Sequence, residues 1–274
     1  MSYCPKVLFH ASFVTVCFVV LSAASWGQAS HSDQVQVMPP QVRTVDAPSP
    51  DATADDLEKR ADELHAQKLY LDAIDYYRAA LKKTPNDARL LNKVCRTQLM
   101  LQRWKDARSN CELSIKADHK FADPHINEGV ALYEMGRTGA AIKQYQKAIG
   151  LDDSSASFFS NLGAAEFAKK QFDKALDAYQ KALQLDPDVF ERSSRTGVQA
   201  QVAKPQDRAF YDYSVAKLYA KMGLSDRSLE YLRKAREEGY KDLKKVYTDT
   251  EFAELRKDKR FAELMAAKVP SLPD

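Results

Sequence analysis

The chain has 274 residues, of which 45% are hydrophobic and 29% are charged, so it is long and apolar enough to bury a substantial core. Its 41 basic and 38 acidic residues leave a formal net charge of only +3, which argues against the extended basic surface of a nucleic-acid-binding protein. The composition therefore predicts a folded protein with a mixed, solvated surface.

The N-terminal residues 1–29 are typical of a secretory signal peptide. One basic residue, Lys6, precedes an apolar run over residues 7–24, and small residues that suit a cleavage site follow. Cleavage would leave a periplasmic or secreted protein. The apolar run is also close to the minimum length for spanning a bilayer, so an uncleaved N-terminal anchor is the alternative and would be the only expected contact with a membrane.

Residues 30–54 are rich in Pro, Ser, Asp and Gln and contain no Phe, Trp or Tyr. Such a segment cannot bury enough apolar surface to offset the entropy that is lost on ordering. We therefore expect a flexible linker.

A period of 34 residues runs through residues 55–189. Alanine recurs in phase at Ala73, Ala107, Ala141 and Ala175, and four positions later come Tyr77, Cys111, Tyr145 and Tyr179. A fixed period of this length indicates a solenoid of stacked repeats. We predict an all-α fold, a right-handed solenoid of helical hairpins with four regular repeats, each of two short amphipathic helices and a tight turn.

The fourth repeat resembles the tetratricopeptide repeat. It contains Phe159-x2-Leu162-Gly163, Ala175, Tyr179, Ala182 and Pro187 at the spacings of that family. The second repeat departs from the pattern at Arg108, Cys111, Ser114 and His119. Together with the N-terminal segment, the resemblance implies an exported bacterial member of the family.

The period breaks at residues 190–208, which we predict to be an inserted loop or small hairpin. A divergent fifth repeat follows at residues 209–242. We expect residues 243–274 to form helices that cap the open end of the stack, because an uncapped array would expose an apolar face.

The resemblance implies that the first helices of the repeats line a concave groove, which binds an extended or helical segment of a partner protein. Ten residues are placed in this groove: Asn92, Arg96, Ile126, Val130, Tyr133, Ser160, Ala164, Phe167, Tyr213 and Lys217. Asn92 and Arg96 either bind a carboxylate or a backbone amide of the partner, or they are simply solvated. Glu58 and Asp62 place negative charge where the basic clamp of some co-chaperones would need cations, which argues against that role.

The two cysteines of the expected mature chain, Cys95 and Cys111, take the close-contact position of the first helix and the aromatic position of the second within one repeat. Both should therefore face the same interface. They form either a buried pair of thiols or a disulfide, and export to an oxidising compartment favours the disulfide.

The sequence contains no metal-binding spacing of His and Cys, no glycine-rich phosphate loop and no Gly-x-Ser-x-Gly elbow. His119 and His125 lie on either side of a turn with few carboxylates near them. We expect no catalytic residue, no cofactor and no metal site.

These observations predict a non-enzymatic adaptor that binds another protein, as yet unidentified, through its groove in an extracytoplasmic compartment. Two alternatives stay open. One is a self-assembling or structural envelope protein, and the other is an accessory subunit of an envelope enzyme or a secretion complex.

Overall fold

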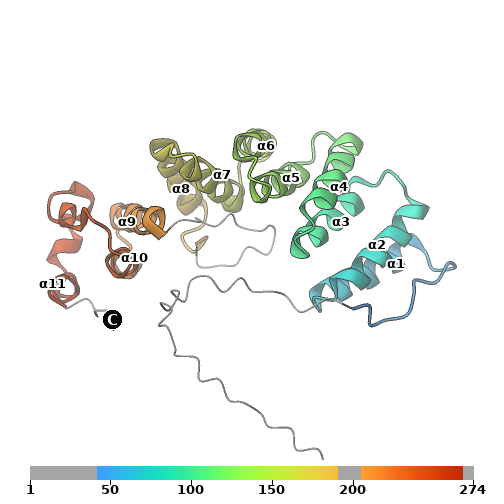
Figure 1. Ribbon diagram of the computed structural model, residues 1–274, viewed down its shortest axis with the longest axis horizontal. Coiled ribbons are helices and arrows are strands. Elements are labelled where there is room, and N and C mark those ends of the chain that lie inside the picture. The colour runs from blue at the N-terminus through green and yellow to red at the C-terminus, as the bar shows by residue number, and fades with distance from the viewer. Residues whose placement is uncertain (1–41, 191–204, 268–274) are drawn as a thin grey trace, which may run out of the picture. The chain divides into compact units, whose positions relative to one another are not determined.

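The computed structural model describes residues 42–190 and 205–267, which all belong to one compact unit, Gln41–Asp274. Within these residues the secondary structure is entirely helical (Figure 1). Consecutive helices pair into hairpins over most of the described chain: α1 (Ala54–Ala66) with α2 (Tyr70–Lys83), α3 (Ala88–Met100) with α4 (Trp104–Ala117), α5 (Asp123–Glu134) with α6 (Thr138–Leu151), α7 (Ala156–Ala168) with α8 (Phe172–Leu185), and α9 (Pro205–Lys221) with α10 (Ser225–Glu237).

Two of the first helices, α1 and α3, begin after a residue whose side chain accepts hydrogen bonds from free backbone N–H groups of the first turn. The Thr53 side chain accepts a hydrogen bond from the backbone N–H of Asp56, at 3.1 Å. The Asp87 carboxylate accepts from the backbone N–H groups of Arg89 and Leu90, at 2.8 and 3.1 Å. Capping of this kind stabilises the first turn of a helix and fixes where the helix begins.

The turn inside each hairpin contains one residue with left-handed backbone. The φ angles at these residues lie between 57° and 75°, and the positions recur with the period of the sequence: Lys68, Gln102, Gly136, Lys170 and, after the insertion, Gly223. Only glycine adopts this conformation without steric cost. The hairpins therefore share one turn geometry, although only two of them have glycine there.

Small residues allow close packing in the core between the two helices of a hairpin. A Cβ atom added to Gly129 would lie 2.3 Å from Cε1 of Tyr145, and one added to Gly163 would lie 2.7 Å from the ring of Tyr179. Both tyrosines are almost fully buried. The glycines thus give room for an aromatic ring to lie directly against a helix backbone.

Residues 42–53, part of the expected flexible linker, lie against α2 instead. The Asp72 carboxylate of α2 is buried and accepts hydrogen bonds from the backbone N–H and the hydroxyl of Thr44, at 3.1 and 3.3 Å. The guanidinium of Arg43 pairs with Asp75, and Val45 packs on the core of the first hairpin. The low apolar content of this segment could not reveal these polar contacts. Residues 1–41, which include the expected signal peptide, lie outside the described part of the chain.

Aromatic contacts join the fourth hairpin to α9. The ring centroids of Phe172 and Phe210 are 4.8 Å apart, and those of Tyr179 and Tyr211 are 5.4 Å apart. Helix α9 begins at Pro205, so the last four residues of the predicted insertion are helical. Residues 191–204 of the insertion lie outside the described residues.

The expected cap contains three short 3-10 helices, η1 (Leu243–Tyr247), η2 (Thr250–Phe252) and η3 (Leu255–Lys257), followed by α11 (Lys259–Ala266). Phe252, Leu255 and Phe261 are buried in the core that α9 and α10 share with the cap. Among the described helices, none is both long and apolar enough to cross a membrane.

Candidate functional site: the first-helix layer

The first helices of successive hairpins form a layer of their own. Helix α5 packs not only on α4 and α6 but also on α3 and α7, whereas α6 makes its main described contacts with α5 and α7 only. We call α1, α3, α5, α7 and α9 the first-helix layer. In a stack of helical hairpins the layer with the closer helix-to-helix contacts is the inner one, and it is the layer expected to line a binding surface.

Most of the ten predicted groove residues are buried in this layer. Three of them, Arg96, Tyr133 and Lys217, are half-buried. The other seven are 9% exposed or less: Asn92, Ile126, Val130, Ser160, Ala164, Phe167 and Tyr213. The side chains that a partner can reach on these helices are therefore fewer than the repeat spacing predicts.

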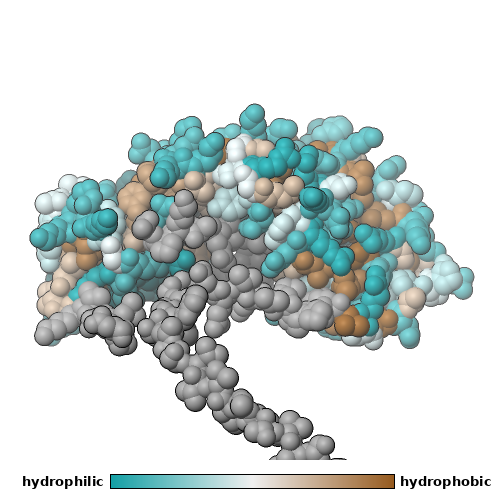
Figure 2. Space-filling model, in the orientation of Figure 1, coloured by the Kyte–Doolittle hydropathy of each residue, from teal (hydrophilic) through white to brown (hydrophobic). Residues whose placement is uncertain are grey.

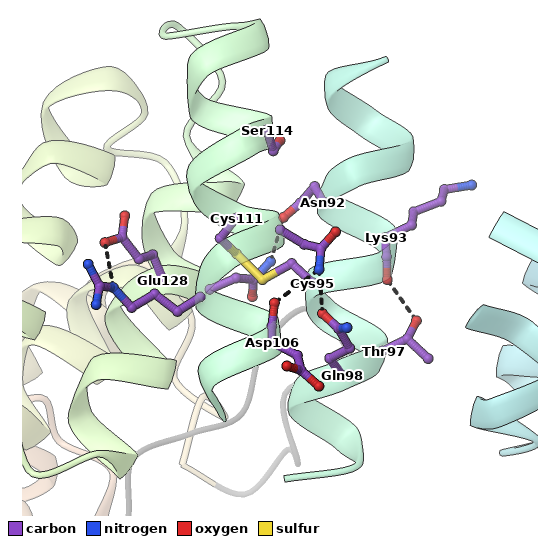
Figure 3. Close-up of a disulfide and its surroundings, with 12 residues drawn as sticks. Asn92, Lys93, Cys95, Thr97, Gln98, Asp106, Cys111, Ser114 and Glu128 are labelled. Atoms are coloured by element: carbon purple, nitrogen blue, oxygen red, sulfur yellow. Dashed lines mark hydrogen bonds and ion pairs between the residues drawn. A yellow bond between two sulfur atoms is a disulfide. The ribbon is translucent and has the colours of Figure 1, made fainter. Parts of the chain in front are cut away.

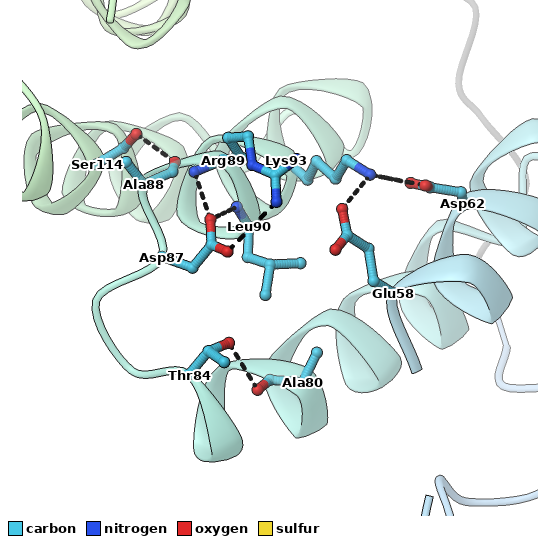
Figure 4. Close-up of polar contacts among 10 residues, drawn as sticks. All are labelled: Glu58, Asp62, Ala80, Thr84, Asp87, Ala88, Arg89, Leu90, Lys93 and Ser114. Atoms are coloured by element: carbon cyan, nitrogen blue, oxygen red, sulfur yellow. Dashed lines mark hydrogen bonds and ion pairs between the residues drawn. The ribbon is translucent and has the colours of Figure 1, made fainter. Parts of the chain in front are cut away.

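Lys93 joins the first two hairpins through an ion-pair cluster (Figure 4). Its ammonium Nζ lies 2.6 Å from Oε1 of Glu58 and 2.6 Å from Oδ2 of Asp62. The hydroxyl of Tyr77 also donates a hydrogen bond to the Asp62 carboxylate, at 2.6 Å. The negative charge that the sequence places on α1 is thus partly neutralised by a cation from α3.

A pair of amides joins the second and third hairpins. The Asn127 side-chain amide donates to the Asn92 Oδ1 at 2.8 Å, and both residues are buried. The Asn127 Oδ1 is itself buried and has no hydrogen-bond donor among the described residues. Lys93 and Asn127 were both missed by the sequence analysis, because each follows a predicted position by one residue and a spacing of one helical turn passes over it.

Arg96 is a half-buried cation of this layer. Its Nε is buried, and the described residues provide no hydrogen-bond acceptor for it. Burial, and then the nearby charge of Arg96, lower the pKa of His65 to about 4, so this imidazole is neutral at pH 7. Burial raises the pKa of Asp123 despite the opposing effect of Arg96. A guanidinium in this setting can receive a carboxylate in a geometry with two hydrogen bonds.

The predicted groove residues of the fifth hairpin are already engaged within the chain. Lys217 Nζ lies 2.9 Å from Oδ2 of Asp249 and 3.3 Å from Oε1 of Glu251, and the Tyr213 hydroxyl donates to Asp249 at 2.9 Å. Asp249 directly precedes η2, and Glu251 lies within it. This part of the cap therefore covers α9 at the positions where a partner was expected.

A disulfide links α3 to α4 between Cys95 and Cys111 (Figure 3). The two Cα atoms are 5.3 Å apart, and both side chains are fully buried. Closing a loop of this separation, 16 residues, stabilises a fold by about 3 kcal/mol through the entropy of the unfolded chain. The disulfide thus fixes the hairpin that carries Asn92, Lys93 and Arg96.

A second polar cluster lies between α4, α5 and α6. Glu128 is buried, and its carboxylate accepts a hydrogen bond from the Gln144 amide at 2.8 Å. His125 Nδ1 lies 2.9 Å from the Gln144 Oε1, so this histidine belongs to the interior, whereas His119 is exposed. Within the described residues no three His, Cys, Asp or Glu side chains are grouped so that they could hold a metal ion.

The described structure is thus a stack of helical hairpins with a charged, partly buried inner layer, the architecture of a helical-repeat solenoid. Models of one family match two overlapping segments of it. Residues 156–189 match the model described as "Tetratricopeptide repeat", and residues 129–168 match the model described as "TPR repeat". These matches support the tetratricopeptide resemblance over the third and fourth hairpins.

Curated relatives include DnaJ homolog subfamily C member 7 of Mus musculus and of Homo sapiens, which are 29% and 28% identical over 103 residues, or 38% of this chain. The aligned residues span only 21% of each relative's length.

Similar solved structures include TTC0263, a thermophilic TPR protein of Thermus thermophilus, with 21% identity, coverage of 78% of this chain and all of that one, and a TM-score of 0.49. A MamA structure has 22% identity, coverage of 72% and 95% of the two chains, and a TM-score of 0.48. YrrB, described as a TPR protein with an unusual peptide-binding site, has 18% identity, coverage of 68% and 86%, and a TM-score of 0.46.

Proposed function

We propose that this protein is a non-enzymatic scaffold that binds a segment of another protein on its first-helix layer, with an acidic group of that segment on Arg96. The observation that carries the proposal is the state of Arg96, whose half-buried side chain forms no ion pair or hydrogen bond with another described residue. The neighbouring cation of the same helix, Lys93, is already neutralised by two carboxylate partners. An incoming carboxylate therefore gains more binding free energy at Arg96 than at Lys93.

The architecture supports this use. Helical-repeat proteins present a preformed, extended surface, so little ordering entropy is lost on their side of the interface. The polar links from α3 to α1 and to α5 hold the surface around Arg96 before a partner arrives. Self-assembly of the chain and a role as an accessory subunit are the alternative functions.

A peptide selection tests the proposal. Random peptides displayed with free C-termini are selected on the full chain, and the affinity of the selected peptides is then measured for two variants. Arg96→Ala is expected to weaken binding at least tenfold, in line with the loss of a charge-assisted hydrogen bond worth about 1.5–3 kcal/mol. Arg89→Ala is the control, because Arg89 is an exposed arginine of the same helix that pairs with Asp87.

Peptides that bind both variants equally would overturn the role of Arg96. Selection of peptides without acidic residues would overturn the proposed chemistry of the partner.

We also propose that the chain is exported. The apolar N-terminal segment supports export, as does the disulfide, because disulfides persist mainly in oxidising compartments. The intact mass of protein recovered from the extracytoplasmic fraction tests this. Loss of a segment that ends near residue 29 is expected, and a chain found only in the cytoplasm would contradict export.

A further inference from the structure

Three of the hairpins share a contact in which a tyrosine of the second helix accompanies a small residue of the first. The pairs are Gly129 with Tyr145, Gly163 with Tyr179, and Ala61 with Tyr77 in the same core cluster. In each pair both residues are almost fully buried. The ring fills the space between the two helices, and in the glycine pairs it leaves no room for a Cβ atom.

The second hairpin has a different pair at the same two positions. Cys95 lies 34 residues before Gly129, Cys111 lies 34 residues before Tyr145, and their sulfur atoms are bonded. A cysteine side chain is far smaller than a tyrosine ring, so this hairpin lacks the aromatic contact between its helices. Figure 3 shows the disulfide spanning the space between α3 and α4.

Helix α3 also holds the polar groups that join the first three hairpins. Lys93 reaches Glu58 of α1, Asn92 accepts from Asn127 of α5, and Arg96 lies next to Cys95 in the sequence. The position of α3 against α4 therefore decides whether these groups meet their partners.

We propose that the Cys95–Cys111 disulfide takes the place of the tyrosine contact in the second hairpin, so that α3 holds its charged side chains in position only in the oxidised protein. The inference deepens the proposed function, because α3 carries Arg96, but it can be tested without any partner. It concerns a structural bond and not a rapid switch: both sulfurs are fully buried, and a reductant reaches them only when the hairpin opens.

Reduction by a dithiol supplies two electrons and two protons. The S–S bond breaks, each cysteine sulfur ends as a thiol, and the reductant becomes a disulfide. In a solenoid each repeat contacts only its neighbours, so loosening the second hairpin should leave distant hairpins intact.

Hydrogen–deuterium exchange of the full chain, read by mass spectrometry, tests the proposal. In Cys95→Ala/Cys111→Ala the amides of α3 and α4 should exchange about tenfold faster or more than in the oxidised wild type, while those of α9 and α10 stay unchanged. Cys95→Gly/Cys111→Tyr restores the glycine–tyrosine pair of the neighbouring hairpins. It should return the exchange of α3 and α4 to within about threefold of the oxidised wild type, even with a reductant present.

The reciprocal variant Gly129→Cys/Tyr145→Cys covers the case in which the introduced tyrosine does not fit. Removal of the Tyr145 ring frees the space that a Cβ at position 129 needs, so this pair should oxidise and lose two hydrogens in the intact mass. Equal protection of α3 and α4 in the oxidised wild type and the double alanine variant would overturn the proposal. So would two free thiols at positions 129 and 145 after refolding with an oxidant.

Discussion

At the scale of single residues, the residues that recur with the 34-residue period are mainly those that pack between helices, and they say less about where a partner binds. Gly129 and Gly163 recur because a tyrosine ring lies against each of them, and this use of small residues is visible in the sequence. The contacts between each ring and its glycine are not visible there. The sequence also could not show that seven of the ten predicted groove residues are buried, or that Lys93 faces two carboxylates. The reason is that a repeat spacing places residues on a helix face but does not show what covers them.

Gly129→Ala tests the close contact with Tyr145. The added Cβ would lie 2.3 Å from a ring carbon, so the ring or the helix must shift, and the free energy of unfolding should fall by about 1–3 kcal/mol. The control is Gly150→Ala in α6, because a Cβ there meets nothing within 4 Å. This substitution should raise the free energy of unfolding by up to about 1 kcal/mol, since alanine favours a helix more than glycine does. Urea denaturation of both variants measures the two effects, and equal stability of the two would refute the contact.

Asp212 of α9 makes stability depend on pH. Burial, followed by the nearby charge of Glu238, raises the pKa of Asp212 to about 7, against the opposing effects of Lys234 and Arg208. The folded chain therefore binds a proton that the unfolded chain releases near pH 4, so this contribution to stability is present at low pH and is lost as the pH rises through 7.

We expect Asp212→Asn to be more stable than the wild type at pH 8, and this advantage should shrink by pH 5. Thermal unfolding between pH 4.5 and 8.5 measures the difference, with Asp177→Asn of the exposed surface of α8 as the control. An advantage of Asp212→Asn that does not vary with pH would contradict the assignment.

At the scale of elements, the helical hairpins follow from apolar periodicity and from capping residues such as Asp87, and both are readable in the sequence. The turns are less readable. Gly136 and Gly223 are evident turn residues, but Lys68, Gln102 and Lys170 adopt the same left-handed backbone without any sequence signal. Likewise, composition alone suggested a flexible linker at residues 30–54, but Thr44 within that segment binds the buried Asp72.

Lys170→Gly tests the shared turn geometry. Lysine at a φ of 60° is strained, so glycine should raise the free energy of unfolding by about 0.5–1 kcal/mol, after allowance for the greater entropy of the unfolded chain. Gly136→Ala, at a φ of 73°, should lower it by a similar amount. Chemical denaturation checks both, and changes of the same sign would show that backbone strain does not govern these turns.

At the scale of the whole described unit, the two ends of the solenoid are closed in different ways. Residues 42–53 lie on α2 at one end, and the cap covers α9 at the other through Asp249 and Glu251.

On the face seen in Figure 2, hydrophilic residues predominate along the upper edge, and hydrophobic residues are interspersed below it. The accessible binding surface is therefore expected around α3 and α5, where Arg96 and Tyr133 are half-buried.

The central claim is that a partner segment lies on the first-helix layer. Photo-crosslinking tests it most directly, with a benzophenone amino acid introduced at Tyr133 of α5 or at Leu113, an exposed residue of α4. With a peptide selected on the wild-type chain and used at a concentration below its Kd, we predict a crosslink from position 133 whose yield the Arg96→Ala substitution lowers about tenfold or more, and no crosslink from position 113. A crosslink from position 113 alone, or one from position 133 whose yield Arg96→Ala leaves unchanged, would contradict the account.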